Sequence, residues 1–274
     1  MADRILLSQD GLASLDLLTM PLYEEKSPWL NKKKPALIIA PGGSYKYCSD
    51  REGLPVAFKF LSKGYQCFVL NYHCGDQSDY PSPFKDLARA VKYVKDHKDY
   101  FGIDQDQISL LGFSAGGHLV GTYGALIDKE EFQKDMGLTR DELKVKNLIL
   151  AYPAIHLKPL VEAVEKTNYH DQVGKLFTSY EEIKDGYAMA HKDMPRTFIF
   201  HAIDDDLVPV GLTLDYLKRL LDLGVDVEFY MPSQGGHGFA TGDDLSNYGR
   251  KINSRISIWT DLVDEWIKAG MKNA

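Results

Sequence analysis

The chain has 274 residues, of which 44% are apolar and 26% charged, and this length can bury a hydrophobic core without disulfides or a structural metal. Its 32 basic and 39 acidic residues give a formal net charge of −7, so there is no basic surplus to neutralise a phosphate backbone and we expect no nucleic-acid partner. The longest apolar runs, such as residues 36–40, fall far below the ~20 residues of a membrane span, and the first ten residues lack a signal-peptide core, so we expect neither membrane insertion nor secretion.

From residue 36 onward, strand-like apolar runs alternate with helical patterns. The expected strands cover residues 36–40, 66–72, 107–112, 147–152, 196–201 and 225–231. The expected helices cover residues 54–62, 114–127, 211–223 and 247–268, and a further helix begins at Ser82-Pro83. This alternation predicts an α/β fold with a mostly parallel central sheet and helices on both of its faces.

Two of the expected helices begin with capping signals. Ser49 and Glu52 have the spacing of a capping box ahead of the helix at 54–62. Ser82 precedes Pro83 in the way that an N-cap residue precedes a first-turn proline. The sequence therefore predicts a serine cap at both helix starts.

Residues 155–193 interrupt the alternation, because about forty residues separate two expected strands. A stretch of that length is too long for a simple crossover, and it holds several tyrosines. We expect a small helical insertion there, over the edge where the strands have their C-terminal ends. The rest of residues 1–274 is expected to form one domain with it.

A glycine-rich turn follows the strand expected at 107–112. The sequence Gly112-Phe-Ser-Ala-Gly116 leads directly into a helical pattern. In this context Gly-x-Ser-x-Gly is typical of a nucleophile elbow, because the turn is too tight for a Cβ atom at either flank. The Ser114 hydroxyl would project at the N-terminus of a helix, whose positive end favours negative charge. We expect Ser114 to be a nucleophile; the alternative is a turn that merely packs closely.

A serine hydroxyl needs a general base, and the chain has eight histidines. His237 is flanked by glycines in a loop after the last expected strand, at the edge where open α/β sheets bind ligands. We expect His237 to be the base, His118 to be structural within the helix–sheet packing, and His201 to make a backbone contact. The other five have no comparable context: His73, His97, His156, His170 and His191.

Three consecutive acidic residues, Asp204, Asp205 and Asp206, follow the fifth expected strand. We choose Asp205 as the carboxylate that orients the imidazole, with Asp206 and Asp204 as alternatives. The competing interpretation is a solvated acidic turn that caps the next helix. The chain order Ser114, Asp205, His237 is the order of nucleophile, acid and base in an α/β-hydrolase sheet.

Acyl transfer also requires N–H donors for the oxyanion of the tetrahedral intermediate. One expected donor is the backbone N–H of Ala115, the residue after the expected nucleophile. The loop Pro41-Gly-Gly-Ser-Tyr45 follows the first expected strand and would supply the second, with Gly43 and Ser44 as the expected contributors. A plain turn is the alternative interpretation of that loop.

The three cysteines, Cys48, Cys67 and Cys74, are odd in number and form no Cys-x-x-Cys pair. This spacing argues against a disulfide framework and against a zinc knuckle. It fits a reducing compartment, and we therefore expect a cytoplasmic protein.

Several segments resemble small bacterial carboxylesterases of the α/β-hydrolase superfamily, near the acetyl-esterase and hormone-sensitive-lipase-like groups. The matching stretches include Pro41-Gly-Gly-Ser-Tyr45, Gly112-Phe-Ser-Ala-Gly-Gly-His118, His201 to Pro209 and Gly236-His-Gly-Phe239. The resemblance implies that Ser114 is the nucleophile, that His237 is the base and, from the pattern His-x-x-x-Asp-x-x-Val-Pro, that Asp205 orients the base. The chain departs from the family at Ser44, where members usually carry a third glycine, and at Ala40, where they often carry a histidine.

The resemblance also implies hydrolysis of short acyl esters, acetylated small molecules or sugars among them, without a metal or organic cofactor. We therefore hypothesise a serine carboxylesterase whose partner is a small-molecule ester. A short-acyl preference is predicted because Ser44, Tyr45 and Tyr47 crowd the expected acyl entrance. Two alternatives stay open: an amidase or peptidase that uses the same three residues, and a non-catalytic homologue that binds a small ligand. The oligomeric state, including a homo-oligomer, is not readable from the sequence.

Overall fold

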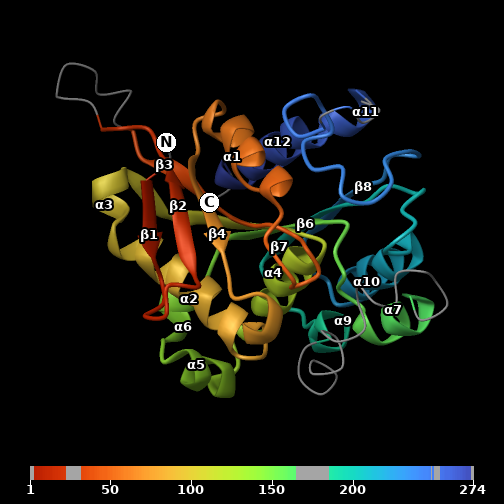
Figure 1. Cartoon of the computed structure of the whole chain (residues 1–274), viewed down its shortest axis with the longest axis horizontal. Coiled ribbons are helices and arrows are strands. Elements are labelled where there is room, and N and C mark those ends of the chain that lie inside the picture. Colours follow the sequence, from red (N-terminus) through yellow and green to blue (C-terminus); the bar gives the residue numbers. More distant parts are fainter. Residues whose placement is uncertain (1–2, 23–31, 165–184, 248, 250–253, 273–274) are drawn as a thin grey trace.

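The structure is a computed structural model that describes residues 3–22, 32–164, 185–247, 249 and 254–272. Within these ranges, eight strands form one sheet in the order β1-β2-β4-β3-β5-β6-β7-β8 (Figure 1). The strands are β1 Asp3–Leu6, β2 Ser14–Leu18, β3 Lys34–Ala40, β4 Gln66–Asn71, β5 Ile103–Phe113, β6 Asn147–Ala151, β7 Arg196–Phe200 and β8 Val227–Tyr230. The six strands from β4 to β8 in this order run parallel, which confirms the predicted α/β class with a mostly parallel sheet.

One edge of the sheet is an antiparallel hairpin, β1–β2, that we did not predict from the sequence. β2 pairs antiparallel with β4, so the hairpin extends the sheet beyond the parallel strands. Arg4 and Asp16 lie opposite each other in its register, and Arg4 Nη2 donates to Asp16 Oδ2 at 2.9 Å. Both strands are short and β1 is largely exposed, so the apolar pattern that would reveal them is weak.

Helices cover both faces of this sheet (Figure 1). α1 (Leu54–Leu61) and α12 (Trp259–Lys272) pack on one face, and α2 (Ser82–Asp96), α4 (Ala115–Leu126) and α10 (Val210–Asp222) pack on the other. Shorter elements are α3 Lys98–Phe101, α5 Glu130–Met136, α6 Arg140–Leu143, α7 Leu157–Val164, α9 Gly186–Met189, α11 Ser254–Ser257 and the 3₁₀ turns η1 Asp50–Glu52 and η2 Gly75–Gln77. None of the helices in the described ranges is both long and apolar enough to cross a membrane.

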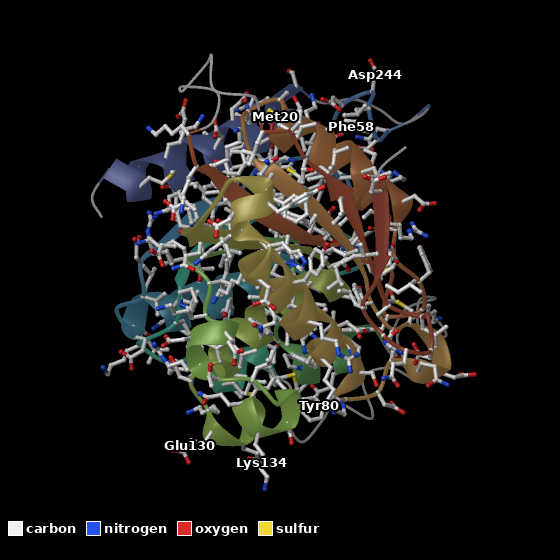
Figure 2. All side chains as sticks on the ribbon, turned by 90° about the vertical axis from the view of Figure 1, so that its left-hand side faces the viewer. Met20, Phe58, Tyr80, Glu130, Lys134 and Asp244 are labelled. Atoms are coloured by element: carbon white, nitrogen blue, oxygen red, sulfur yellow. The ribbon has the colours of Figure 1, made fainter. Side chains whose placement is uncertain are left out.

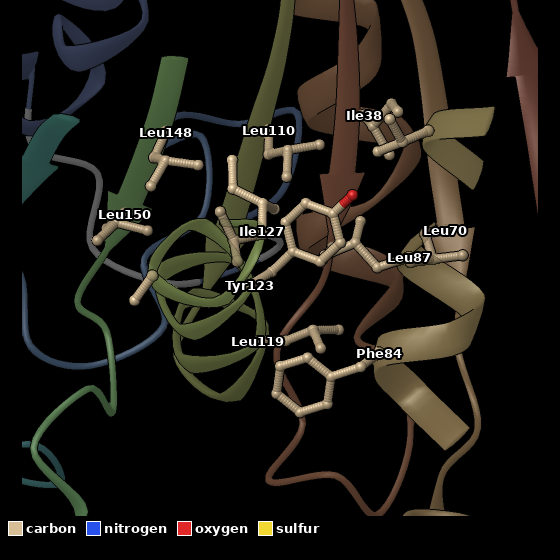
Figure 3. Close-up of a cluster of buried hydrophobic side chains, with 14 of the residues drawn as sticks. Ile38, Leu70, Phe84, Leu87, Leu110, Leu119, Tyr123, Ile127, Leu148 and Leu150 are labelled. Carbon is tan, nitrogen blue, oxygen red and sulfur yellow. The ribbon is translucent and has the colours of Figure 1, made fainter. Parts of the chain in front are cut away.

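Successive side chains of the central strands enter two different hydrophobic layers. Ile38 of β3 belongs to the layer that contains Leu119 and Tyr123 of α4 (Figure 3). Its neighbour Leu37 belongs to the opposite layer, where Trp259 of α12 is fully buried. A strand covered on both faces must be apolar at every position, which explains the continuous run that made β3 easy to predict.

The helices α1 and α5 lie at opposite ends of the side view (Figure 2). Phe58 of α1 is at one end, and Glu130 and Lys134 of α5 are at the other. Tyr80 lies at the α5 end, and its hydroxyl donates to Asp135 Oδ2 at 2.6 Å. This hydrogen bond connects the loop before α2 with α5.

Both predicted serine caps are wrong. Ser49 precedes η1 without a side-chain capping bond, and α1 begins only after Gly53. Ser82 is the first residue of α2, and Pro81 occupies the N-cap position. Glu52 does not return to Ser49 because its carboxylate binds a backbone N–H of another loop.

The final helix begins later than expected. α11 starts at Ser254 and α12 at Trp259, whereas we expected one helix from residue 247. Asn247 has no regular secondary structure, and residues 248 and 250–253 of the expected helix lie outside the described residues.

Residues 165–184, the middle of the expected insertion, also lie outside the described residues. The ends of the insertion contain α7 and α9, and α9 packs against α4. Tyr187 N–H donates to Ile155 O at 3.2 Å, which closes the two ends of the insertion against each other. The cap role of the insertion and the single domain across residues 1–274 stay predictions.

Candidate active site

A sharp strand-to-helix turn places Ser114 between β5 and α4. Its backbone has φ 51° and ψ −112°, a strained conformation for a residue with a Cβ atom. A Cβ on Gly112 would lie 2.1 Å from Gly116 O, and one on Gly116 would lie 2.1 Å from Ala40 O. Glycine is therefore required at both flanks, and the geometry expected of an elbow is present.

Ser114, His237 and Asp205 come together in one row of hydrogen bonds. His237 Nε2 lies 2.9 Å from Ser114 Oγ, and His237 Nδ1 lies 2.8 Å from Asp205 Oδ2. The carboxylate can only accept, so Nδ1 carries a proton and Nε2 of the neutral ring is free to accept one from the serine. The Asp205 side chain is fully buried while the His237 side chain is 14% exposed, so the row opens toward solvent at the imidazole.

Asp205 accepts four hydrogen bonds. Oδ1 accepts from the backbone N–H groups of Leu207 and Val208 at 3.0 and 2.8 Å. Oδ2 lies 3.0 Å from His201 Nε2 and 2.8 Å from His237 Nδ1. Burial alone would raise the pKa of Asp205, but the hydrogen bonds from the two histidines outweigh burial and hold this pKa below its ordinary value. The carboxylate is therefore negative whenever the imidazole next to it becomes positive.

His201 has a role that we did not predict beyond its backbone contact. Its Nε2 faces two acceptors, Asp205 Oδ2 and Val208 O, each at 3.0 Å. Nε2 must therefore carry a proton, and in the neutral ring Nδ1 accepts from the Thr213 hydroxyl at 2.9 Å. The two acceptors at Nε2 thus fix the tautomer in which His201 supports the carboxylate, and the buried Thr213 hydroxyl matches it.

The structure separates Asp205 from its two acidic neighbours. Asp204 Oδ1 accepts from Gly235 N–H at 2.7 Å and from Gly236 N–H at 2.8 Å. It therefore shapes the loop that leads to His237 without touching the imidazole. Asp206 is exposed to solvent. Of the three aspartates, Asp205 is the one whose carboxylate meets the His237 ring.

The loop after β3 lies against the elbow. A Cβ on Gly42 would lie 3.1 Å from Ser114 Cβ, so the loop backbone passes directly beside the serine. Gly43 has φ 128°, and a Cβ on it would lie 2.0 Å from Tyr47 O. Ser44 follows with φ 54°, in the left-handed region that L-residues seldom occupy. Tight backbone geometry therefore brings the main chain, rather than side chains, toward the serine.

Three N–H groups at this place have no protein partner within the described part of the chain. They belong to Gly43, Ser44 and Ala115. Ala115 is the first residue of α4, so its N–H has no acceptor within the helix. The structure thus keeps unpaired donors close to Ser114, as an oxyanion site requires.

Glu52 joins the loop after β3 to the rest of the site, and we did not predict this from the sequence. Its buried carboxylate accepts from Gly42 N–H through Oε2 at 2.8 Å and from the Tyr152 hydroxyl through Oε1 at 2.7 Å. The Tyr152 oxygen accepts in turn from Ala240 N–H at 3.1 Å. Glutamate at this spacing suggested a capping box, so the sequence offered no signal for its contact with a distant tyrosine.

Tyr152 also forms one wall of the histidine site. Its ring packs edge-on against the His237 ring, with centroids 5.0 Å apart and an interplanar angle of 66°. Burial, followed by the nearby charge of Glu52, raises the pKa of Tyr152 well above its ordinary value. The phenol therefore stays protonated at neutral pH and donates to Glu52.

Tyr45 does not lie at the acyl entrance, which corrects our expectation. It is fully buried, its hydroxyl lies 2.8 Å from His118 Nδ1, and its ring packs edge-on against Tyr72. His118 is itself fully buried in α4, as expected of a structural histidine. Tyr47 is 62% exposed, so among the aromatic residues of the loop only this one faces solvent.

No metal-binding cluster accompanies these residues in the described ranges. There, no group of three or more His, Cys, Asp or Glu side chains has a geometry that could hold a metal ion.

The chain matches the BD-FAE family model over residues 22–220. A protein named acetylxylan esterase from Xylanibacter ruminicola is 26% identical over 236 residues, 79% of this chain. Among solved structures, the α/β-hydrolase enzyme MGS-M1 from a Medee basin deep-sea metagenome library is 28% identical, with a TM-score of 0.77 and coverage of 98% of this chain and 97% of its own. The carboxylesterase Cest-2923 from Lactobacillus plantarum is 25% identical, with a TM-score of 0.79 and coverage of 94% and 92%.

The extent of these similarities differs between curated relatives and solved structures. The chain spans 45% of the length of the acetylxylan esterase, and 33% and 50% of the length of two other curated relatives that it matches. The two solved structures, in contrast, align over nearly their whole length. Because the family model covers well over half of the chain, and because whole-length structural relatives share its sheet and helices, the chain belongs to the BD-FAE family and has the α/β-hydrolase fold.

Proposed function

We propose that this protein is a serine carboxylesterase that hydrolyses short acyl esters through an acyl-enzyme intermediate. The observation that carries the proposal is the row from Ser114 Oγ through the His237 ring to Asp205 Oδ2, with contacts of 2.9 and 2.8 Å. An intact row of this kind is what nucleophilic attack by a hydroxyl requires. The names of the relatives, an acetylxylan esterase and a carboxylesterase, support the same reaction class.

In the proposed reaction, Ser114 Oγ attacks the ester carbonyl while His237 Nε2 takes the hydroxyl proton. Asp205 holds the imidazole in the tautomer that can accept this proton and stabilises the cation that forms. The carbonyl π bond opens to an oxyanion, which collapses and expels the alcohol with the proton from His237. Water then repeats the sequence on the acyl-serine, with His237 again as base, and releases the acid.

The oxyanion is proposed to lie among the backbone N–H groups of Ala115, Gly43 and Ser44. Ala115 opens α4, so the positive end of the helix dipole adds to its hydrogen bond. The closeness of Gly42 to the Ser114 Cβ supports this location. The reaction as proposed uses groups of the chain and water, without a cofactor.

Acetyl esters of small molecules or sugars are the proposed substrates. The support comes from the name of the acetylxylan esterase and from Ser44, whose side chain takes up room on the loop beside Ser114. An amidase or peptidase would need the same row, so paired p-nitrophenyl esters and anilides of one acyl group separate the two reactions. Turnover of the anilide at a rate comparable to the ester would favour the amidase.

Fluorophosphonate labelling tests the assignment of the nucleophile. We expect the reagent to modify the wild-type protein at Ser114, located by peptide mapping, and not to modify Ser114→Ala. Ser233→Ala is the matched control, because Ser233 is an exposed serine close to the His237 loop. Failure to label the folded wild-type protein, together with no turnover of p-nitrophenyl acetate, would favour a non-catalytic ligand-binding homologue.

A further inference from the structure

Two cysteines lie side by side next to the candidate active site. Cys48 Sγ and Cys74 Sγ are 3.8 Å apart although 26 residues separate them in the chain. Cys48 belongs to the loop after β3 that contains Gly42 and Gly43, and Cys74 follows β4. We did not expect a disulfide from the sequence, because an odd number of cysteines without a Cys-x-x-Cys pair gives no pairing signal.

The two thiols differ from the third cysteine in their access to solvent. Cys67 is fully buried in a strand, whereas Cys48 and Cys74 are both partly exposed. Cys48 also lines a cavity of about 340 Å³ together with Pro41 and Ser49. A small reagent can therefore approach Cys48 through this cavity, whereas Cys67 is closed to it.

The environment also favours reaction at Cys48. The hydrogen bond with Cys74 lowers the pKa of the Cys48 thiol against the opposing effect of burial. A thiolate is the nucleophile in thiol–disulfide exchange, and a second thiol at van der Waals distance can complete the exchange. The pair thus has both an attacking and a resolving sulfur.

We propose that Cys48 and Cys74 are a modification site that forms a reversible intramolecular disulfide by exchange with a small-molecule disulfide such as oxidised glutathione. The Cys48 thiolate attacks one sulfur of the reagent, whose S–S bond breaks and releases the first thiolate. Cys74 then loses its proton and attacks the Cys48 sulfur, which releases the second thiolate. Two protein thiols are oxidised by two electrons, and one small disulfide is reduced to two thiols.

Closing the bond must draw the two sulfurs together. An S–S bond is about 2.05 Å long, so the sulfurs must approach by about 1.8 Å. The segment of Cys74 is firmly held, because the neighbouring His73 ring lies 2.6 Å from Asp86 Oδ2 and 2.9 Å from Asp10 Oδ2. The adjustment therefore falls mainly on the loop that carries Cys48.

That loop is one closed unit with the expected oxyanion donors. Ser49 N–H donates to Gly42 O at 2.9 Å, and Lys46 N–H donates to Gly43 O at 2.9 Å. A displacement at Cys48 is therefore transmitted to the backbone beside Ser114. This consequence rests on the proposed function: oxidation is expected to lower ester turnover on the order of 10- to 100-fold, as small misplacements of catalytic groups do.

Mass spectrometry tests the modification independently of any activity. The native protein is incubated with oxidised glutathione, the remaining thiols are alkylated, and the intact mass and peptides are analysed. We expect one Cys48–Cys74 cross-link and an alkylated Cys67 in the wild-type protein, and the same cross-link in Cys67→Ala. Cys48→Ser and Cys74→Ser should both lack the cross-link, and Cys74→Ser should trap a glutathione adduct on Cys48. The proposal would be overturned if the wild-type protein formed no cross-link, or if Cys48 and Cys74 each kept a stable glutathione adduct in place of the disulfide.

Ester turnover before and after oxidation tests the effect on the loop. We expect the wild-type protein to lose ester turnover on oxidation and to recover it with dithiothreitol. Cys48→Ser cannot react at this position, so its own ester turnover should be the same before and after oxidation. A complete cross-link with full turnover would overturn the proposed effect on the loop. If the reduced wild-type protein has no ester turnover at all, the proposed function fails. The proposed disulfide is then tested by mass spectrometry alone.

Discussion

Glu52 and Gly42 are joined by a hydrogen bond in which Glu52 Oε2 accepts from Gly42 N–H at 2.8 Å. The other oxygen of this buried carboxylate accepts from the Tyr152 hydroxyl, which itself accepts from Ala240 N–H. One side chain thus fixes the loop beside Ser114 relative to the loop that follows His237. Buried polar groups that lose such a partner are costly, so the two loops are expected to move when Glu52 is removed.

Glu52→Ala is expected to lower kcat for p-nitrophenyl acetate by about 10- to 100-fold with little change in KM, because the donors beside Ser114 lose their support. Glu52→Gln keeps an oxygen that can accept from Gly42 and should recover much of this loss. Asp50→Ala removes an exposed acid from the same 3₁₀ turn and serves as the control. A rise in KM at constant kcat, or equal losses in both Glu52 variants, would contradict a positioning role.

Ser114→Ala removes the proposed nucleophile. We expect kcat for p-nitrophenyl acetate to fall by on the order of 10³-fold or more, while the melting temperature stays close to the wild-type value because alanine keeps the Cβ atom and the backbone conformation. Steady-state kinetics with Ser233→Ala in parallel provides the comparison. Turnover near the wild-type rate in a folded Ser114→Ala protein would remove the basis of the proposed mechanism.

Asp205→Asn tests which carboxylate acts on the imidazole. An asparagine can present its NH₂ group to His237 Nδ1, which favours the wrong tautomer, so kcat is expected to fall by on the order of 10³- to 10⁴-fold. Asp206→Asn makes the same substitution at an exposed neighbouring residue and should leave kcat close to the wild-type value. Similar losses in the two variants would mean that local charge, rather than the contact with His237, decides the rate.

Ser44→Gly tests the proposed short-acyl preference. Glycine has no Cβ to strain at φ 54° and leaves more room beside the acyl group, so we expect butyrate to gain relative to acetate in kcat/KM by about 3- to 10-fold. A series of p-nitrophenyl esters from acetate to decanoate measures this ratio. Wild-type turnover that is faster on decanoate than on acetate would contradict the short-acyl preference altogether.

His73 predicts a pH dependence of stability. Burial would lower its pKa, but hydrogen bonds to Asp10 and Asp86 outweigh burial and raise the pKa above its ordinary value. A raised histidine pKa adds stability that is fully present below about pH 6.5, the unfolded value, and is lost as the pH rises through the folded value. Urea titrations measure the free energy of unfolding of the wild type and of His73→Asn. The amount by which the wild type is more stable should shrink between about pH 6 and pH 9.

His97→Asn is the control for this measurement, because His97 is exposed and meets no carboxylate in the described contacts. The same urea titrations are run on this variant in parallel. If the difference in the free energy of unfolding between the wild type and His73→Asn stays constant across this range, the two carboxylates do not hold a proton on the His73 ring.

Local patterns were enough to predict the parallel core and the edge at which the candidate site lies. Each central strand contains a short, nearly continuous apolar run because both of its faces are covered, and this signal is contained in a few neighbouring residues. Since parallel strands end at a common edge, Ser114, Asp205 and His237 were expected near one another before any contact was known. The β1–β2 hairpin escaped prediction because its strands are short, β1 is largely exposed, and neither carries such a pattern.

Only the tertiary structure decided which side chains pair. Glu52 has a local spacing that favours a helix cap, yet it binds Gly42 and Tyr152, the latter 100 residues away. Cys48 and Cys74 meet because two loops at the sheet edge pack together, although nothing in their spacing marks them as a pair. Secondary structure follows from neighbours along the chain, whereas a buried hydrogen bond depends on how distant segments are oriented once the core has formed.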